Sequence, residues 1–282
     1  MDQIISEIIT KGVSFLNITL PPEAALMFES YFDYLTRRRK DFNLTAIYGA
    51  EDVARLHFLD SIALLNVVRR YAIINAPSSG LSDDPVHLKS AQFNEATVLS
   101  QVHLHNTTHS SAAMNVMRMI DIGSGAGFPG LPLKIAEPAI DLTLLEANGK
   151  RITFLSELCA ALGVSAALVH ARAEEAAHNF DMRELFDIVL SRAVARLDIL
   201  CELCLPFARV GGVLLAMKGI DSDEEIAAAR NAMATLGAEY ADSNDYTIPD
   251  TDITHRAVVI RKTAPTPDAY PRRFARISKN PL

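Results

Sequence analysis

The sequence predicts an α/β fold: a Rossmann-like, mostly parallel sheet with helices on both faces, preceded by an N-terminal helical cap. Two observations carry this prediction. From residue 116 onward, short apolar runs alternate with segments of helical period, which is typical of parallel strands joined by helical crossovers. A glycine-rich turn directly follows the first of these runs, at the place where folds of this class bind their ligands.

The composition is that of a folded globular protein. The 282 residues are 49% hydrophobic and 22% charged, with 13 Gly and 13 Pro, which excludes a disordered or collagen-like chain. No apolar run approaches the ~18 residues of a membrane span, and residues 1–10 lack the basic start of a signal peptide. Three cysteines make no disulfide framework, so we expect a cytoplasmic protein. The net charge of −7 argues against nucleic-acid binding over the whole surface but allows a local basic patch.

Residues 1–74 are predicted to form the helical cap. Apolar residues recur at helical spacing near the start of the chain, again from Pro21 to Leu35, and again from Glu51 to Tyr71. Alone, none of these helices would bury its apolar stripe, so we expect them to pack on one another or on the next domain. Residues 75–115 are polar and rich in turn-forming residues, which we interpret as a flexible insertion. The expected domains are the cap (1–74), the insertion (75–115), the sheet domain (116–263) and a basic C-terminal tail (264–282).

Strands and helices are expected in alternation after the insertion. The strands are expected at Val116–Ile122, Ile140–Glu146, Ala166–His170, Phe186–Ser191, Gly212–Lys218 and His255–Lys262. The helices are expected at Leu131–Ala136, Lys150–Leu162, Arg196–Phe207 and Asp223–Leu236. This order predicts one sheet that is covered by helices on both faces.

The turn after the first strand is the most informative segment. It reads Asp121-Ile-Gly123-Ser-Gly125-Ala-Gly127-Phe128-Pro129-Gly130 and opens the next helix. Glycines in such a turn permit positive φ and a close approach of backbone to ligand. The dinucleotide fingerprint G-x-G-x-x-G is not met, because Phe128 stands where its third glycine would be.

Acidic residues near the turn favour S-adenosylmethionine over a nicotinamide cofactor. Glu146 ends the second strand, where an acid would bind a ribose diol with either cofactor. Asp121, directly before the glycines, would suit a cationic amino-acid moiety and repel a pyrophosphate. The third strand ends near Arg172-Ala173-Glu174, a polar site placed to meet an adenine edge. A nicotinamide-dependent oxidoreductase stays open as an alternative.

Six motifs, four in the sheet domain and two in the cap, resemble the RsmG/GidB family. They are D-I-G-S-G-A-G-F-P-G-L-P-L, L-L-E-A-N-G-K-R-I-T-F-L, A-R-A-E-E and S-R-A-V-A in the sheet domain, with N-L-T-A-I and H-F-L-D-S in the cap. The tail, from Tyr270-Pro271-Arg272-Arg273 to Lys279-Asn280-Pro281-Leu282, is similar as well, so that the likeness covers nearly the whole chain apart from the insertion. The resemblance implies a class I S-adenosylmethionine-dependent methyltransferase fold. It also implies methylation of guanine N7 in small-subunit (16S) ribosomal RNA.

The resemblance also assigns site residues. It carries the family's cofactor contacts onto Gly123, Phe128, Ala173, Glu174 and Arg192. The physical argument above adds Gly125 and Glu146. Guanine N7 has a free lone pair and no proton, so no general base is expected, and the work of the enzyme is alignment. Arg192 is the predicted positioning residue, which would close the cofactor pocket and place positive charge near the RNA.

RNA binding is expected to depend on local cations. The target base must lie in a loop or be flipped out, because the A-form major groove is too narrow for side chains. Residues 37–40, Arg-Arg-Arg-Lys, lie at the C-terminus of a predicted helix, where cations also suit the helix dipole. The segment from Arg261 to the end holds six Arg and Lys against Asp268 alone, a net charge of +5. Both clusters are candidates for phosphate contacts.

The remaining signals are weaker. Cys201-x-x-Cys204 is half of a zinc pattern within an apolar helix, so we expect buried cysteines and no metal. For His57 we favour packing or hydrogen bonding over catalysis. We expect a monomer, because no sustained heptad is visible. A ribosome-assembly or RNA-binding factor that retains the fold without catalysis is the second alternative function.

Overall fold

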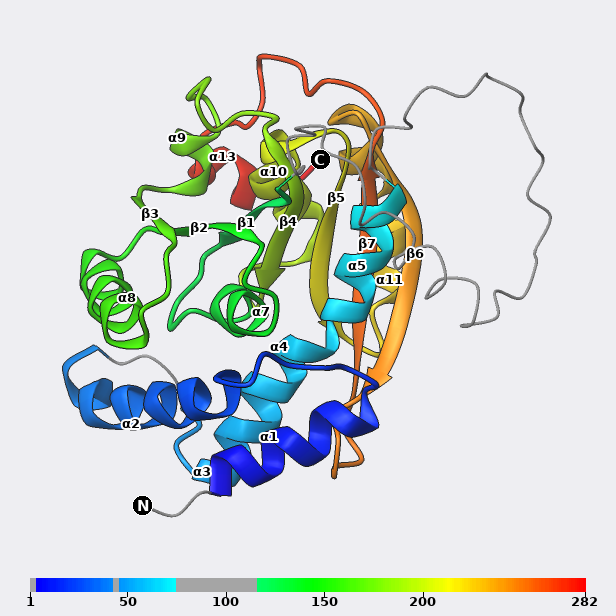
Figure 1. Ribbon diagram of the computed structural model, residues 1–282. Coiled ribbons are helices and arrows are strands. Elements are labelled where there is room, and N and C mark those ends of the chain that lie inside the picture. The colour runs from blue at the N-terminus through cyan, green and yellow to red at the C-terminus, as the bar shows by residue number, and fades with distance from the viewer. Residues whose placement is uncertain (1–3, 43–45, 75–115) are drawn as a thin grey trace, which may run out of the picture. The chain divides into compact units, whose positions relative to one another are not determined.

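Strand order explains how the sheet creates a ligand site. The computed structural model describes residues 4–42, 46–74 and 116–282, so the expected insertion at 75–115 lies outside the described residues. Within these residues, seven strands form one sheet in the order β3-β2-β1-β4-β5-β7-β6 (Figure 1). The chain order reverses between β1 and β4, and such a switch point opens a crevice at the carboxyl ends of the strands.

The parallel part of the sheet matches the prediction. Its strands are β1 (Arg118–Ile122), β2 (Asp141–Glu146), β3 (Ala167–His170), β4 (Phe186–Arg192) and β5 (Ala208–Gly219). These five are parallel to one another, and β7 (Thr254–Lys262) runs antiparallel between β5 and β6 (Ala238–Thr247). The expected mostly parallel sheet is therefore confirmed.

Strand β6 was not predicted from the sequence. It lies at the edge of the sheet and pairs only with β7 among the described strands. Its register shifts between Tyr240 and Asp242, and a bulge of this kind breaks the alternation of apolar and polar residues. Most of its residues are exposed or half-buried, so no apolar periodicity marks the segment as a strand.

Helices cover both faces of the sheet. One face carries the N-terminal helices α1 (Ile4–Phe15), α2 (Ala24–Phe42), α3 (Ala50–Val53), η1 (Ala54–Leu59), α4 (Asp60–Ala63) and α5 (Leu65–Ile74), with α7 (Gly130–Ala136) and α8 (Gly149–Leu162). The other carries α9 (Ala173–Ala176), α10 (Leu197–Cys204), η2 (Leu205–Phe207), α11 (Asp223–Ala228), α12 (Arg230–Thr235) and α13 (Phe274–Lys279). Each face of the sheet has its own hydrophobic core, and successive side chains of β4 alternate between the two. Ile188 and Leu190 pack in the core beneath the N-terminal helices, and Val189 packs in the core on the opposite face.

The third predicted helix of the cap is interrupted. In place of one helix from Glu51 to Tyr71, the structure has α3, η1, α4 and α5 in succession, and η1 is a π-helix. π-helical turns inside α-helices occur frequently at functional sites. This one carries His57, and α4 begins directly after it with Asp60.

The C-terminal segment packs on the body of the protein. Ile277 in α13 is fully buried. The Arg272 guanidinium forms an ion pair with Glu202, whose side chain is 1% exposed. Lys262 is also fully buried and pairs with Glu184. Two of the six cations counted from Arg261 onward thus serve internal ion pairs, and the charge available to a partner is smaller than the sequence count suggests.

Two further expectations concern membranes and cysteines. None of the helices in the described ranges combines the length and the apolar character needed to cross a bilayer. The side chains of Cys201 and Cys204 are fully buried. Within the same ranges, no group of three or more His, Cys, Asp or Glu side chains is arranged to hold a metal ion.

Candidate active site

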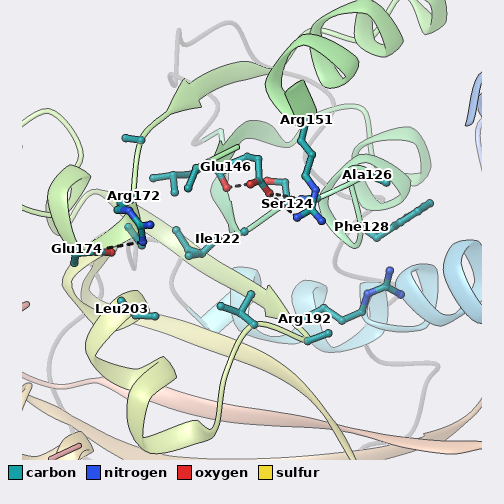
Figure 2. A pocket seen from close by; sticks show the side chains of 18 of the residues that line it. Ile122, Ser124, Ala126, Phe128, Glu146, Arg151, Arg172, Glu174, Arg192 and Leu203 are labelled. Atoms are coloured by element: carbon teal, nitrogen blue, oxygen red, sulfur yellow. Dashed lines mark hydrogen bonds and ion pairs between the residues drawn. The ribbon is translucent and has the colours of Figure 1, made fainter. Parts of the chain in front are cut away.

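A cavity of about 440 Å³ lies at the carboxyl ends of the first four strands (Figure 2). Its size is in the range of pockets for cofactors and drug-sized ligands. The seven residues that the sequence assigns to the site all line it: Gly123, Gly125, Phe128, Glu146, Ala173, Glu174 and Arg192. They come from four separate turns, which the parallel strands deliver to one edge of the sheet.

The glycine turn wraps one side of the cavity. Gly123, Gly125 and Gly127 have φ of 73°, 58° and 101°, a region that residues with a side chain seldom adopt. The Gly123 amide donates to the Leu145 carbonyl at 2.8 Å, which ties the turn to the end of β2. A Cβ on Gly123 would lie 2.8 Å from the Val194 side chain, so both conformation and space require glycine there.

Asp121 supports the turn from behind and does not line the cavity. Its side chain is fully buried, and Oδ2 accepts a hydrogen bond from the Gly130 amide at 2.9 Å. Oδ1 is buried without a hydrogen-bond partner among the described residues. Burial raises the pKa of this carboxyl to about 7. The hypothesis that Asp121 meets a cationic ligand group is therefore wrong: its carboxyl caps the first turn of α7.

Glu146 combines a structural role with exposure to the cavity. Glu146 is 5% exposed. Oε2 accepts from the Gly125 amide at 3.0 Å and Oε1 accepts from the Asn148 amide at 2.8 Å. Arg151, which the sequence analysis did not single out, lies 3.8 Å from Oε2 (Figure 2). A carboxylate has about four acceptor positions, so these contacts leave room for hydroxyl donors of a ligand.

The opposite end of the cavity is formed by the start of α9. Glu174 has a 10% exposed side chain and lies 3.8 Å from Arg172 (Figure 2). The Arg172 guanidinium lies 6.0 Å from the centre of the Phe274 ring. Phe274 itself lines the cavity, so the C-terminal segment contributes a wall that no local motif indicated.

Aromatic side chains of the N-terminal helices hold Phe128. Its ring stacks on Tyr31 with centroids 5.3 Å apart and on His57 with centroids 4.6 Å apart. The Tyr31 hydroxyl donates to the Ala126 carbonyl at 2.6 Å. The helical cap therefore shapes the glycine turn directly.

Arg192 extends from the end of β4 toward the N-terminal helices (Figure 2). Its guanidinium lies 5.1 Å from the centre of the Phe128 ring, within range of a cation–π interaction. Nη1 donates to the Leu56 carbonyl at 3.3 Å and pairs with Asp60 at 3.2 Å. The next residue, Ala193, has a φ of 56°, and strained backbone of this kind clusters at functional sites.

Asp60 joins three donors from distant parts of the chain. The residue is 1% exposed. Besides Arg192, its carboxylate accepts from the Tyr246 hydroxyl at 2.9 Å and from His255 Nδ1 at 2.8 Å. The hydrogen bond to Asp60 raises the pKa of His255. The sequence offered H-F-L-D-S as a family motif, but nothing in the pattern connected Asp60 to residues almost 200 positions away.

Histidine 57 has the opposite electrostatic character. Burial, followed by the nearby Arg192 cation, lowers the pKa of His57 to about 4. The imidazole is therefore neutral at pH 7. Its Nδ1 lies 3.3 Å from the Arg192 guanidinium. This agrees with the expected packing and hydrogen-bonding role, although the ring also lines the cavity.

Comparison with known proteins decides the family. Residues 86–253 match the family described as "GidB: rRNA small subunit methyltransferase G". A ribosomal RNA small subunit methyltransferase G from Alkaliphilus oremlandii is 36% identical over 279 residues, which cover 99% of this chain and 99% of that protein. The protein of the same name from Lactobacillus johnsonii is 35% identical over 277 residues, with 98% and 99% covered. The chain belongs to this family.

Membership in the methyltransferase G family confirms the resemblance stated from the motifs. The class I methyltransferase fold and the cofactor S-adenosylmethionine follow from it. Among solved structures, M. jannaschii TYW2 in complex with AdoMet is similar with a TM-score of 0.41 and 15% identity, over 51% of this chain and 66% of that chain. That likeness is distant, and no residue is assigned from it.

Asp121 makes a testable contribution to the pH dependence of stability. Its pKa is 3.8 in the unfolded reference and about 7 in the folded protein. Between these values the folded state binds the extra proton, so stability falls by up to about 1.4 kcal/mol per pH unit as pH rises. We expect the unfolding free energy of the wild type, relative to Asp121→Asn, to fall from about pH 5 to about pH 7 in urea titrations. A constant difference would show that Asp121 is ionised throughout.

Proposed function

We propose that the protein transfers a methyl group from S-adenosylmethionine to N7 of a guanine in 16S ribosomal RNA, in the cytoplasm. The observation that carries the proposal is a near-full-length likeness to methyltransferase G proteins, together with a preformed glycine cradle beside a buried carboxylate. The cradle suits a nucleoside, because backbone can approach it closely at Gly123 and Gly125.

Each assigned residue has a distinct part in holding the cofactor. The backbone of Gly123 and Gly125 forms the floor under it. The Glu146 carboxylate, fixed by two amide donors, accepts from the ribose hydroxyls. Ala173 and Glu174 meet the adenine edge. Phe128, held by Tyr31 and His57, closes the side nearest the N-terminal helices.

The geometry favours this cofactor over a dinucleotide. A pyrophosphate would bind the free amides at the start of the helix after the glycine turn. In this protein the first amide of α7, that of Gly130, already donates to Asp121. A second carboxylate, Glu146, accepts from Gly125. The Gly130 amide is therefore unavailable to a phosphate, and the Glu146 carboxylate beside the turn disfavours a dianionic group.

The chemistry requires alignment more than proton transfer. S-adenosylmethionine supplies an electrophilic methyl group, and guanine N7 supplies a lone pair without a proton to remove. Arg192 is fixed by Asp60 and by the Leu56 carbonyl, so it can place the base without moving far. Neutral His57 adds no charge beside the reacting atoms. Holding the nucleophile and the methyl carbon in line then supplies the rate.

Methyl transfer to ribosomal particles tests the proposal directly. Small ribosomal subunits from a bacterial strain lacking this methyltransferase are incubated with the protein and radiolabelled S-adenosylmethionine, and the modified base is mapped. We expect label on one guanine at N7. RNA binding without label would favour the assembly-factor alternative, and binding of NADH in place of S-adenosylmethionine would favour the oxidoreductase.

A pair of glycine substitutions tests the cofactor cradle. Gly123→Val places a branched side chain at a φ of 73° against Val194, so we expect cofactor affinity to fall at least about 100-fold, or about 2.8 kcal/mol. Gly163→Val is the matched control, because Gly163 also has positive φ but caps α8 with no heavy atom within 4 Å of an added Cβ. Equilibrium dialysis measures both. Wild-type affinity in Gly123→Val would refute the assignment.

Exposed cations beside the cavity are proposed to contact RNA phosphates. Arg273, Arg276 and Lys279 are exposed and form no ion pair within the described part of the chain. Their segment contributes Phe274 to the cavity wall. In the other basic cluster, residues 37–40, Arg37 forms an ion pair with Asp33 at 3.2 Å.

Salt dependence distinguishes these phosphate contacts from a structural role. Replacing Arg273, Arg276 and Lys279 by Ala in one variant is expected to make log affinity for RNA fall less steeply with log salt, by about 1 unit of slope per cation. Arg230→Ala is the control, since Arg230 is an exposed cation on α12, and it should leave the slope unchanged. An unchanged slope in the triple variant would remove the segment from the RNA interface. Filter binding at several salt concentrations provides the measurement.

A further inference from the structure

A second cavity adjoins the cofactor site. It has a volume of about 580 Å³ and shares His57, Arg192 and Ala193 with the first cavity. Its other walls are Ile47, Leu56, Asp60, Met217, Lys218, Gly219, Ile253 and His255. No residue assignment made above for the cofactor requires this space.

Sheet topology brings the second cavity to the same edge as the first. Strand β5 is parallel to β4, and Met217 lies beside Arg192, the last residue of β4. The last residues of β5, up to Gly219, therefore lie at the same edge of the sheet. Because β7 is antiparallel, its first residues lie at this edge, with His255 opposite Gly219. One edge of the sheet thus presents both cavities side by side.

The polar lining of the second cavity is rich in hydrogen-bond donors. The Asp60 carboxylate already accepts from Arg192, Tyr246 and His255. The Arg192 guanidinium has five N–H groups and directs three of them to Leu56, Asp60 and His57. Lys218 lines the cavity, but its Nζ is held by the Ala195 carbonyl at 2.8 Å and by Glu225 at 2.6 Å, outside the cavity lining. Arg192 has no acceptor atom in its side chain. A ligand edge that accepts hydrogen bonds is therefore favoured there.

The remaining walls are apolar and suit a flat ring. Leu56, Met217 and Ile253 contribute aliphatic side chains to the cavity. Enzymes that modify a flipped base hold it between apolar side chains and recognise its edge by hydrogen bonds. Guanine presents an acceptor, O6, next to N7, whereas adenine presents an amino donor at the same position.

We propose that the second cavity is the pocket for the flipped guanine, with O6 facing the donor Arg192 and N7 facing the first cavity across His57 and Ala193. The inference rests on the proposed function, since it names the site of that reaction's nucleophile. Asp60 is a positioning residue here: it holds Arg192 and His255 and already accepts three hydrogen bonds. Adenine is disfavoured because its amino donor would face the N–H groups of Arg192 at the position where guanine offers O6.

Gly219 offers a way to fill the pocket without disturbing the fold. It lines the second cavity and not the first. An added Cβ would meet no heavy atom within 4 Å, and its φ lies outside the left-handed region. Gly219→Phe therefore blocks the pocket, and Gly219→Ala is the matched control that leaves most of the space open.

The first experiment uses the full chain loaded with S-adenosylhomocysteine and nucleotide probes. We expect guanosine monophosphate to bind at least about 10-fold more tightly than adenosine monophosphate, with ribose 5-phosphate not competing. Gly219→Phe should abolish guanosine monophosphate binding and keep the wild-type affinity for S-adenosylmethionine, while Gly219→Ala stays close to wild type. Equal binding of the two nucleotides, or competition by ribose 5-phosphate, would overturn the proposal.

The second experiment separates this pocket from the proposed function. Methyl transfer to small subunits should fall at least about 100-fold in Gly219→Phe, with the affinity for S-adenosylmethionine unchanged. Undiminished transfer in Gly219→Phe would place the base elsewhere while the methyltransferase activity stands. If the wild type transfers no methyl group, the proposed function fails, and the nucleotide titration still decides whether the cavity binds guanine.

Discussion

The buried Asp60 carboxylate is the interaction on which the site depends. A carboxylate that is 1% exposed needs several donors to compensate for its lost hydration. It finds them on β4, β6 and β7, in Arg192, Tyr246 and His255. The consequence is a fixed junction between the N-terminal helices and the open edge of the sheet, and both cavities share that junction as a wall.

Two further carboxylates preorganise the glycine turn. Asp121 accepts from the Gly130 amide and Glu146 accepts from the Gly125 amide. Backbone with positive φ at Gly123, Gly125 and Gly127 has little intrinsic preference for one shape, so these bonds select it. The cofactor cradle is thus held by hydrogen bonds that exist before any ligand binds, which reduces the ordering cost of binding.

Local patterns predicted the parts of the site that local sequence controls. The glycine turn, the acid at the end of β2 and the polar start of α9 each follow a strand directly, and all seven assigned residues line one cavity. The sequence could not show that Asp121 points away from the ligand, because its orientation is set by the amide of Gly130 in the next helix. The sequence therefore located Asp121 at the end of β1 but did not show which way its side chain points.

Long-range partners explain what else was missed. His255 and Tyr246 reach the site only because β7 and β6 pair antiparallel at the edge of the sheet, and β6 has no apolar periodicity to reveal it. The cations of the C-terminal segment looked equivalent in sequence. Their roles separate only in the fold, where Lys262 and Arg272 pair with buried or half-buried carboxylates and Arg276 stays exposed.

Charge balance at the junction indicates where the rate of the proposed reaction comes from. Methyl transfer moves one positive charge from sulfur to the base. Arg192 is paired with Asp60, and His57, with a pKa of about 4, is neutral at pH 7. These groups therefore stabilise the positive charge about equally on the sulfur of the methyl donor and on the methylated base. The rate of the proposed reaction therefore comes from holding the reacting groups in place more than from stabilising the moving charge. The ion pair with Asp60 fixes the Arg192 side chain for this purpose.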